Sequence, residues 1–91
     1  MGAPKVLVVL ARHDHTEAMR VAAGLTIFGH AVRLIFMGGP VADTPENAVQ
    51  AESLELADVL PETTVPDQGL PYLDTAGLAA ALATAEAVMS L

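Results

Sequence analysis

Five consecutive residues, Arg12-His13-Asp14-His15-Thr16, form the one cluster of ligand-type side chains in this sequence. Two histidines separated by one residue can reach the same metal ion from an extended loop, with Asp14 as a third ligand or as the partner that orients one imidazole. The same residues suit an anion or another small ligand, held by Arg12 and the start of a helix. They also suit a purely structural loop, in which Asp14 or Thr16 caps the following helix. The sequence leaves these three interpretations open.

A second turn of interest is Gly38-Gly39-Pro40, which ends an apolar run over residues 31–37. Glycines at such a turn let the backbone approach a ligand or a neighbouring chain closely. Ligands of open α/β sheets bind beyond the carboxyl ends of the strands, so we expect the two turns to lie side by side and to share one site. The candidate ligand-binding residues are Arg12, His13, Asp14, His15, Thr16, Gly38 and Gly39.

Several kinds of chemistry are missing from the sequence. The chain has no cysteine, which excludes disulfides, thiolate metal sites and cysteine nucleophiles. The turn after the first apolar run has no glycine, so it matches neither a dinucleotide fingerprint nor a phosphate-binding P-loop. Ser53 and Ser90 have no histidine near them in the sequence. Because no catalytic constellation is recognisable, we expect a protein that is not an enzyme.

The elements that must position these turns follow from hydrophobic periodicity. Apolar residues at steps of three and four predict helices, and short β-branched apolar runs predict strands. Gly29 follows the first predicted helix, where a left-handed turn commonly ends one. The predicted strands cover 5–10, 31–37, 63–65 and 85–91, the last of them buried, and the predicted helices cover 17–28, 44–57 and 75–84.

This alternation predicts an α/β fold in a single domain over residues 1–91. We expect a small, open, mostly parallel sheet of about four to five strands with helices on both faces. The segment 61–71 carries three prolines and is long for a loop in a compact domain, which is typical of loops that are functional or held by a partner. Arg33 interrupts the second strand, as expected for an edge strand or for an ion pair with the acidic half of the chain across an interface.

Charge and hydropathy limit the partners. Residues 1–42 carry a net charge of +2 and residues 43–91 one of −9, for −7 in total. Nucleic-acid binding requires clustered basic residues, so we expect no nucleic-acid partner. No apolar run approaches the roughly 20 residues of a membrane span, and residues 1–4 lack the basic segment of a signal peptide, so we expect a cytoplasmic protein. The chain is 53% hydrophobic, and this apolar excess without disulfides predicts a homo-oligomer or a subunit of a hetero-oligomer.

The run KVLVVLARHDHTEAMRVAAGLTIFGHAVRLIFMGGPV resembles the first half of the DsrE/DsrF/DsrH-like proteins, which include the Tus-type sulfur-relay subunits. The shared pattern is an apolar first strand, a short polar loop, a helix of small and apolar residues, a Gly-His turn, and a strand ending near Gly-Gly. The resemblance covers about residues 4–58. It implies a doubly wound sheet, assembly into trimers or hexamers, and membership of a family whose active members pass sulfur from a cysteine persulfide.

This chain departs from that family because it has no cysteine to carry a persulfide. The resemblance therefore implies a cysteine-free oligomeric protein that is a non-catalytic subunit, alone or with related subunits, or a small-ligand-binding protein linked to intracellular sulfur transfer. The alternative is a metal- or anion-dependent binder or enzyme that uses the His13-Asp14-His15 loop.

Overall fold

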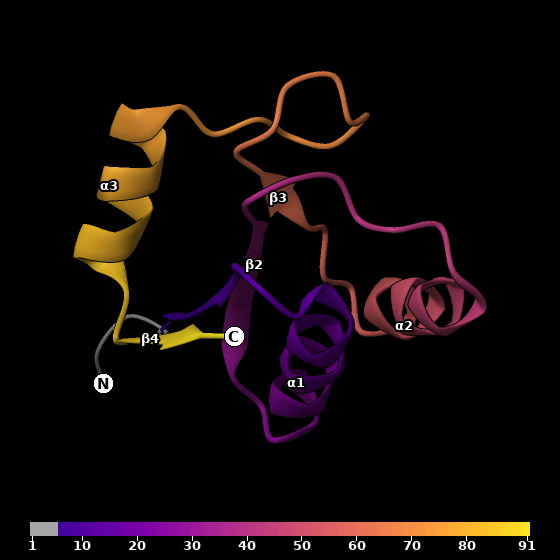
Figure 1. Cartoon of the computed structure of the whole chain (residues 1–91). Coiled ribbons are helices and arrows are strands. Elements are labelled where there is room, and N and C mark those ends of the chain that lie inside the picture. The colour runs from indigo at the N-terminus through magenta and orange to yellow at the C-terminus, as the bar shows by residue number, and fades with distance from the viewer. Residues whose placement is uncertain (1–5) are drawn as a thin grey trace.

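The computed structural model describes residues 6–91, and these residues form one open sheet with three helices (Figure 1). The sheet is four-stranded and all-parallel, in the order β3-β2-β1-β4, which confirms the predicted α/β fold. Lys5, where we predict the first strand to begin, and residues 1–4 lie outside the described residues. The elements are β1 (Val6–Ala11), α1 (His15–Ile27), β2 (Ala31–Phe36), α2 (Pro45–Leu56), β3 (Glu62–Thr63), α3 (Thr75–Thr84) and β4 (Ala87–Ser90).

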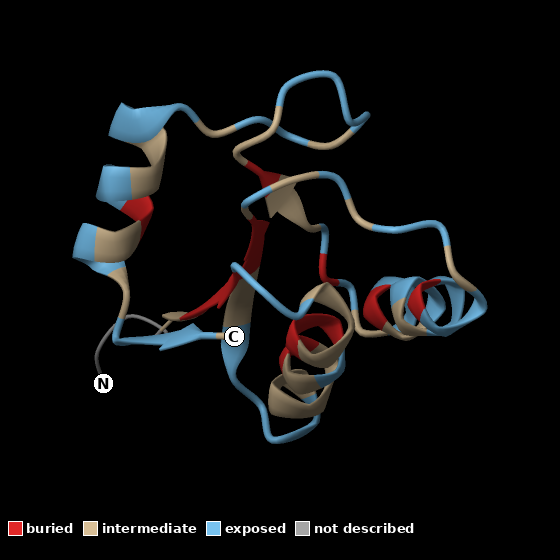
Figure 2. Ribbon diagram, in the orientation of Figure 1, coloured by how far each residue is buried: buried red, intermediate tan, exposed pale blue. Residues whose placement is uncertain are grey.

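Helices cover both faces of the sheet, but unequally. Successive strand residues point to opposite faces, so Val9 and Leu34 pack with α1 and α2, whereas Val8 and Ile35 pack with α3. Figure 2 shows the buried residues concentrated along the two central strands and the inner faces of α1 and α2. On α3 only Ala81 is buried. The main core therefore lies between the sheet and the α1/α2 pair.

Side-chain caps set where the helices begin. Asp14 accepts a hydrogen bond from the backbone N–H of Glu17 at 3.0 Å, so α1 starts two residues before the predicted Glu17. Thr44 caps α2 in the same way, with Pro45 at the first helical position. Asp74 caps α3, whose bounds match the prediction. The turn predicted at Gly29 is present, with φ of +84°.

The prediction that the closing strand is buried is wrong. β4 pairs with β1 alone and lies at the edge of the described sheet, and all four of its residues are exposed. Val88 is 45% and Met89 39% exposed. The apolar composition of β4 resembles that of a central strand, but the order of the strands places it at the edge.

Arg33 lies on β2, which is interior in the strand order, but β3 pairs only with Ile35 and Phe36, so Arg33 has a paired strand, β1, on one side alone. It forms a two-pronged ion pair with Glu62, through Nε to Oε1 at 2.9 Å and Nη2 to Oε2 at 2.8 Å. This hydrogen bonding raises the pKa of Arg33 further above its ordinary value. The partner comes from the acidic half of the chain, as expected, but it belongs to the same molecule and joins β2 to β3.

The long loop after β3 closes on itself. The N–H of Thr63 donates to the carbonyl of Pro71 at 2.9 Å, and the N–H of Leu73 donates back to the carbonyl of Thr63 at 2.8 Å. Thr63 is 2% exposed and also faces Phe36 of β2. These bonds anchor both ends of the 64–71 segment at the carboxyl edge of the sheet, in the upper part of Figure 1.

None of the three helices within residues 6–91 has the length and apolar character that crossing a membrane requires.

Candidate functional site

The predicted polar loop after β1 is held by the end of the chain's last strand. The carbonyl oxygen of Leu91 accepts hydrogen bonds from the N–H groups of Arg12, His13 and Asp14, at 3.2, 2.8 and 3.3 Å. Arg12 and His13 precede the helix, and of the N–H groups in the first turn of α1 itself, that of Glu17 is bonded to Asp14. The carboxylate of Asp14 caps the helix. In this conformation Leu91 and the Asp14 cap hold the loop in place.

His15 also acts structurally. Its Nε2 lies 3.0 Å from the carbonyl oxygen of Met37, the residue after β2, and donates a hydrogen bond to it. The ring packs edge-on against Phe36, with the ring centroids 5.3 Å apart. His13 is exposed. Within the described chain, no three His, Cys, Asp or Glu side chains converge in an arrangement that could hold a metal ion.

The two predicted turns do lie side by side. The N–H of Met37 donates to the carbonyl of Ala11 at 2.9 Å. Gly38 adopts φ of +82°, and a Cβ there would lie 3.1 Å from the carbonyl oxygen of Arg12. Glycine is thus required both by the left-handed backbone and by the close approach of the two loops. The predicted site residues come together, and their hydrogen bonds go mainly to other parts of the chain, such as Leu91, Met37 and Asn47.

A large cavity lies beside this region, alongside α2, and Met19 of α1 contributes to its lining. Its volume is about 610 Å³, and it is bounded by α2, the end of β2, residues 58–61 and Leu70. A volume of this order suits a small organic molecule. The walls are mostly apolar, formed by Met19, Phe36, Val41, Leu54, Val59 and Leu70. A smaller hollow of about 150 Å³ adjoins it and is lined in part by the predicted residue Gly39.

Asn47 is the polar group at the inner end of this cavity. It is 7% exposed, its Nδ2 donates to the carbonyl of Ala42 at 2.8 Å, and its Oδ1 accepts from the hydroxyl of Thr16. A side-chain amide carries two N–H groups, and Ala42 takes one of them. Asn47 therefore joins α1, α2 and the 38–44 segment and keeps one donor for a ligand. Through this network the predicted residue Thr16 supports the cavity.

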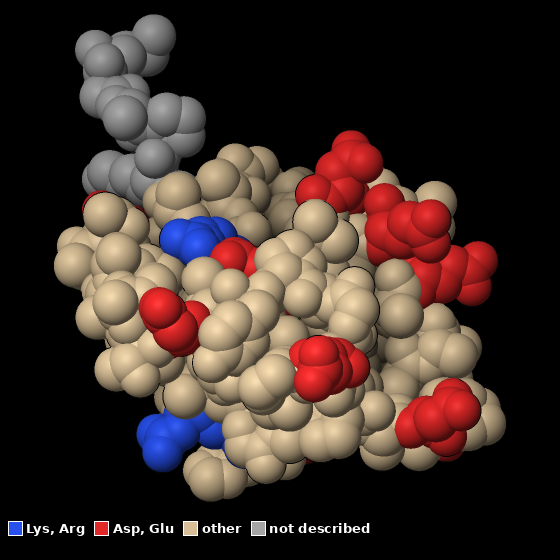
Figure 3. Space-filling view, turned by 90° about the horizontal axis from the view of Figure 1, so that it is seen from above, with Lys and Arg blue, Asp and Glu red and all other residues tan. Residues whose placement is uncertain are grey.

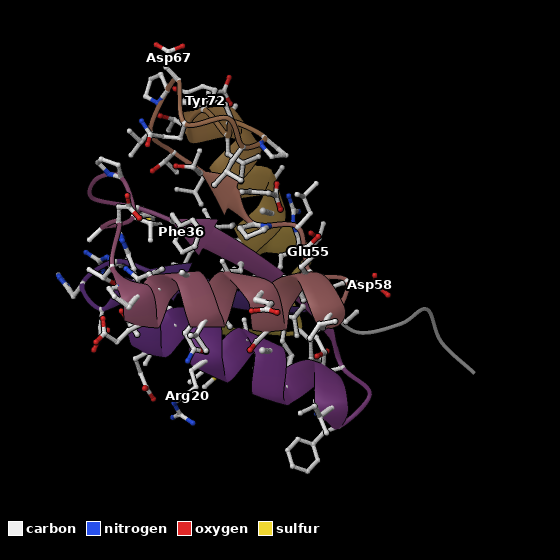
Figure 4. All side chains as sticks on the ribbon, turned by 90° about the vertical axis from the view of Figure 1, so that its right-hand side faces the viewer. Arg20, Phe36, Glu55, Asp58, Asp67 and Tyr72 are labelled. Carbon is white, nitrogen blue, oxygen red and sulfur yellow. The ribbon has the colours of Figure 1, made fainter. Side chains whose placement is uncertain are left out.

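Carboxylates stand at the other end of the cavity. Figure 3 shows acidic side chains gathered over the side of the molecule that α2 occupies. Glu55 and Asp58 line the cavity. Figure 4 looks at α2 from outside, with Phe36 toward the N-terminal half of the helix and Glu55 and Asp58 toward its C-terminal end. The cavity thus runs along α2 from an amide to two carboxylates.

The candidate residues chosen from the sequence did not include the cavity. Two signals point toward it: the long 61–71 segment, whose residues Pro61 and Leu70 line it, and a single asparagine among the apolar positions of α2. Neither signal identifies a cavity without the tertiary structure, because the lining comes from segments up to 51 residues apart.

No protein-family model, no curated protein and no solved structure matches this chain.

Proposed function

We propose that this chain is a cytoplasmic, cysteine-free DsrE-like protein that binds a small molecule without acting on it, as a non-catalytic member of an oligomer linked to intracellular sulfur transfer. The observation that carries the binding proposal is the apolar cavity of about 610 Å³ along α2, which reaches from Phe36 at the carboxyl end of β2 to residues 58–61 ahead of β3. The parallel sheet with helices on both faces is consistent with the resemblance of residues 4–58.

The absence of a catalytic role is supported by the residues around the cavity. Its lining within the described chain contains no serine, histidine, lysine or arginine. Asn47 is neutral, and Glu55 and Asp58 stand at the same end. This set can orient a bound molecule, and it offers neither a hydroxyl nucleophile nor an imidazole or amine base.

Binding can be tested with three six-carbon probes, hexanol, hexylammonium and hexanoate, by following backbone amide NMR shifts. We expect at least one probe to shift the amides of residues 51–59. Ala51→Leu places a larger side chain in the cavity and should weaken that binding by about tenfold or more. Ala48→Leu is the matched control, because Ala48 is an exposed residue of the same helix outside the cavity.

Absence of shifts with all three probes would reject the cavity as a binding site. Equal affinities of the Ala51→Leu and Ala48→Leu variants would place binding elsewhere on the molecule.

A role as a subunit is supported by a separate surface. Ile27, Phe28 and Leu56 are 83%, 80% and 82% exposed, at the C-terminal ends of α1 and α2. A groove of about 480 Å³ between these helices is lined by Ile27 and Leu56. Large apolar side chains grouped on a surface mark interaction sites. We expect native mass spectrometry to show a trimer or hexamer, and Phe28→Asp to dissociate it, whereas a wild-type monomer at micromolar concentration would contradict this role.

A further inference from the structure

We propose that the α2 cavity takes a ligand with a cationic head group, a primary ammonium or a guanidinium, on an apolar body of about six to ten carbons. The head group lies between Glu55 and Asp58, and the apolar body runs along α2 toward Asn47. This inference rests on the proposed function, in which the cavity binds a small molecule, and adds the chemical class of that molecule.

The distribution of charge around the cavity is the first observation. Within residues 6–91 the lining carries two carboxylates and no basic side chain. Arg20 pairs with Glu17, and Arg33 pairs with Glu62, so neither arginine neutralises the cavity mouth. The mouth of the cavity therefore carries negative charge beside apolar walls, and this charge attracts a cation.

The position of these carboxylates on α2 is the second observation. The C-terminus of a helix carries partial negative charge, which favours basic residues in the last turn. The last turn of α2 has no basic residue, and it has Glu55 within it and Asp58 just beyond it. Both carboxylates thus oppose the helix dipole, and a cation bound between them would offset the repulsion.

The backbone of Asp58 is the third observation. The N–H of Asp58 donates to the carbonyl of Glu55 at 3.1 Å, and the N–H of Val59 donates to the carbonyl of Leu54 at 2.9 Å. These two bonds form a Schellman motif, in which Asp58 occupies the left-handed position with φ of 58°. Glycine and asparagine suit that position better than aspartate. A carboxylate therefore stands where both the local backbone and the local charge disfavour one.

The remainder of the cavity defines the other end of the ligand. Leu54 is 1% and Val59 8% exposed, so both belong to the core and form a firm apolar wall. Asn47, at the far end, offers one amide N–H, which suits a weak acceptor on the ligand. A molecule that is cationic at one end and apolar along its length matches both ends of the cavity.

The test compares hexylammonium with hexanol and hexanoate at pH 7, by isothermal titration calorimetry supported by amide NMR shifts. We expect hexylammonium to bind about five- to tenfold more tightly than hexanol, and hexanoate to bind most weakly. Raising the salt from 20 to about 300 mM should reduce the preference for the ammonium. If hexanol and hexylammonium bind equally, the inference is wrong while the proposed binding function stands. If none of the three binds, the proposed function itself fails.

Charge-neutral variants locate the effect. The double variant Glu55→Gln/Asp58→Asn should lose about fivefold or more of the affinity for hexylammonium and keep that for hexanol within about twofold. Asparagine adopts the left-handed conformation readily, so the variant keeps the helix end intact. Glu52→Gln is the matched control, since Glu52 lies on α2 and does not line the cavity. An equal loss in Glu52→Gln, or no loss in the double variant, would overturn the assignment.

Discussion

At the scale of single residues, two polar side chains on or next to α2 give this protein its most distinctive chemistry. Asn47 is buried and hydrogen-bonded to two other segments, whereas Asp58 is exposed and lies in a backbone conformation that favours glycine or asparagine. The first contributes to stability and the second opposes it. Each can be replaced without altering the apolar core, so their effects can be measured separately.

Asp58→Asn should raise the stability of the free protein. The change removes a negative charge from the negative end of α2 and keeps a side chain that tolerates φ of 58°, for a gain of about 0.5 kcal/mol or a few degrees in Tm. Asp67→Asn is the control, because Asp67 also has positive φ, at 62°, but follows no helix. Thermal unfolding measures the Tm of both variants. If Asp67→Asn raises Tm as much as Asp58→Asn does, the backbone conformation alone accounts for the effect.

Asn47→Ala should lower the free energy of unfolding by about 1–3 kcal/mol. It removes the partner of the Thr16 hydroxyl and of the Ala42 carbonyl in a site that is largely closed to water. Urea denaturation measures the loss, and Gln50→Ala on the same helix should change stability by less than about 0.5 kcal/mol. A loss in Asn47→Ala no larger than in the control would show that the network contributes little.

At the scale of elements, the helices and strands begin and end according to local interactions, and α1 illustrates this. Its first turn carries Glu17, favoured by the positive end of the helix, and Glu17 pairs with Arg20 one turn later. This pair lies on the outer surface of α1. The pair affects the pKa of Glu17 more than it affects the packing of the helix.

The pKa of Glu17 should lie below its ordinary value, chiefly because Arg20 donates hydrogen bonds to its carboxylate. A carboxyl whose pKa is lowered in the folded state contributes stability above its unfolded-state pKa and loses it as the pH falls through the folded-state pKa. The contribution is therefore complete at neutral pH and disappears in acid. NMR titration should show the Glu17 pKa rising in Arg20→Gln, and an unchanged pKa in that variant would exclude the ion pair as the cause.

At the scale of the whole molecule, the two faces of the sheet differ in how many buried residues cover them. Among residues 6–91, the α1/α2 face holds nine buried core residues, whereas the α3 face holds four. α3 has one buried residue, Ala81, and lies apart from the α1/α2 pair in Figure 1. Fewer buried contacts give a lower free energy for local opening.

Native-state hydrogen exchange should therefore show α3 opening before the rest of the molecule. We expect its amides to exchange with a lower opening free energy than those of α1, which buries Ala18, Met19 and Ala22. Leu82→Ala should increase exchange in α3 and leave α1 unchanged. Protection of α3 equal to that of α1 in the monomer would contradict this order.

The sequence by itself determined the elements and the fold class. Each helix and strand depends on neighbours within a few residues: apolar periodicity, the caps at Asp14, Thr44 and Asp74, and the turn at Gly29. The sequence also predicted that the loops after β1 and β2 lie side by side, because the carboxyl ends of parallel strands meet at the same edge of a sheet. Local rules were sufficient for these features.

Only the tertiary structure decided the order of the strands and the site. It placed β4 at an exposed edge and paired Arg33 with Glu62 inside one chain. It showed that the carbonyl of Leu91 occupies the backbone donors of the polar loop, and that the cavity is formed along α2. These features join residues up to 80 positions apart, as in the pairing of β1 with β4, and such contacts arise from the packing of whole elements, which the local pattern of a sequence does not specify.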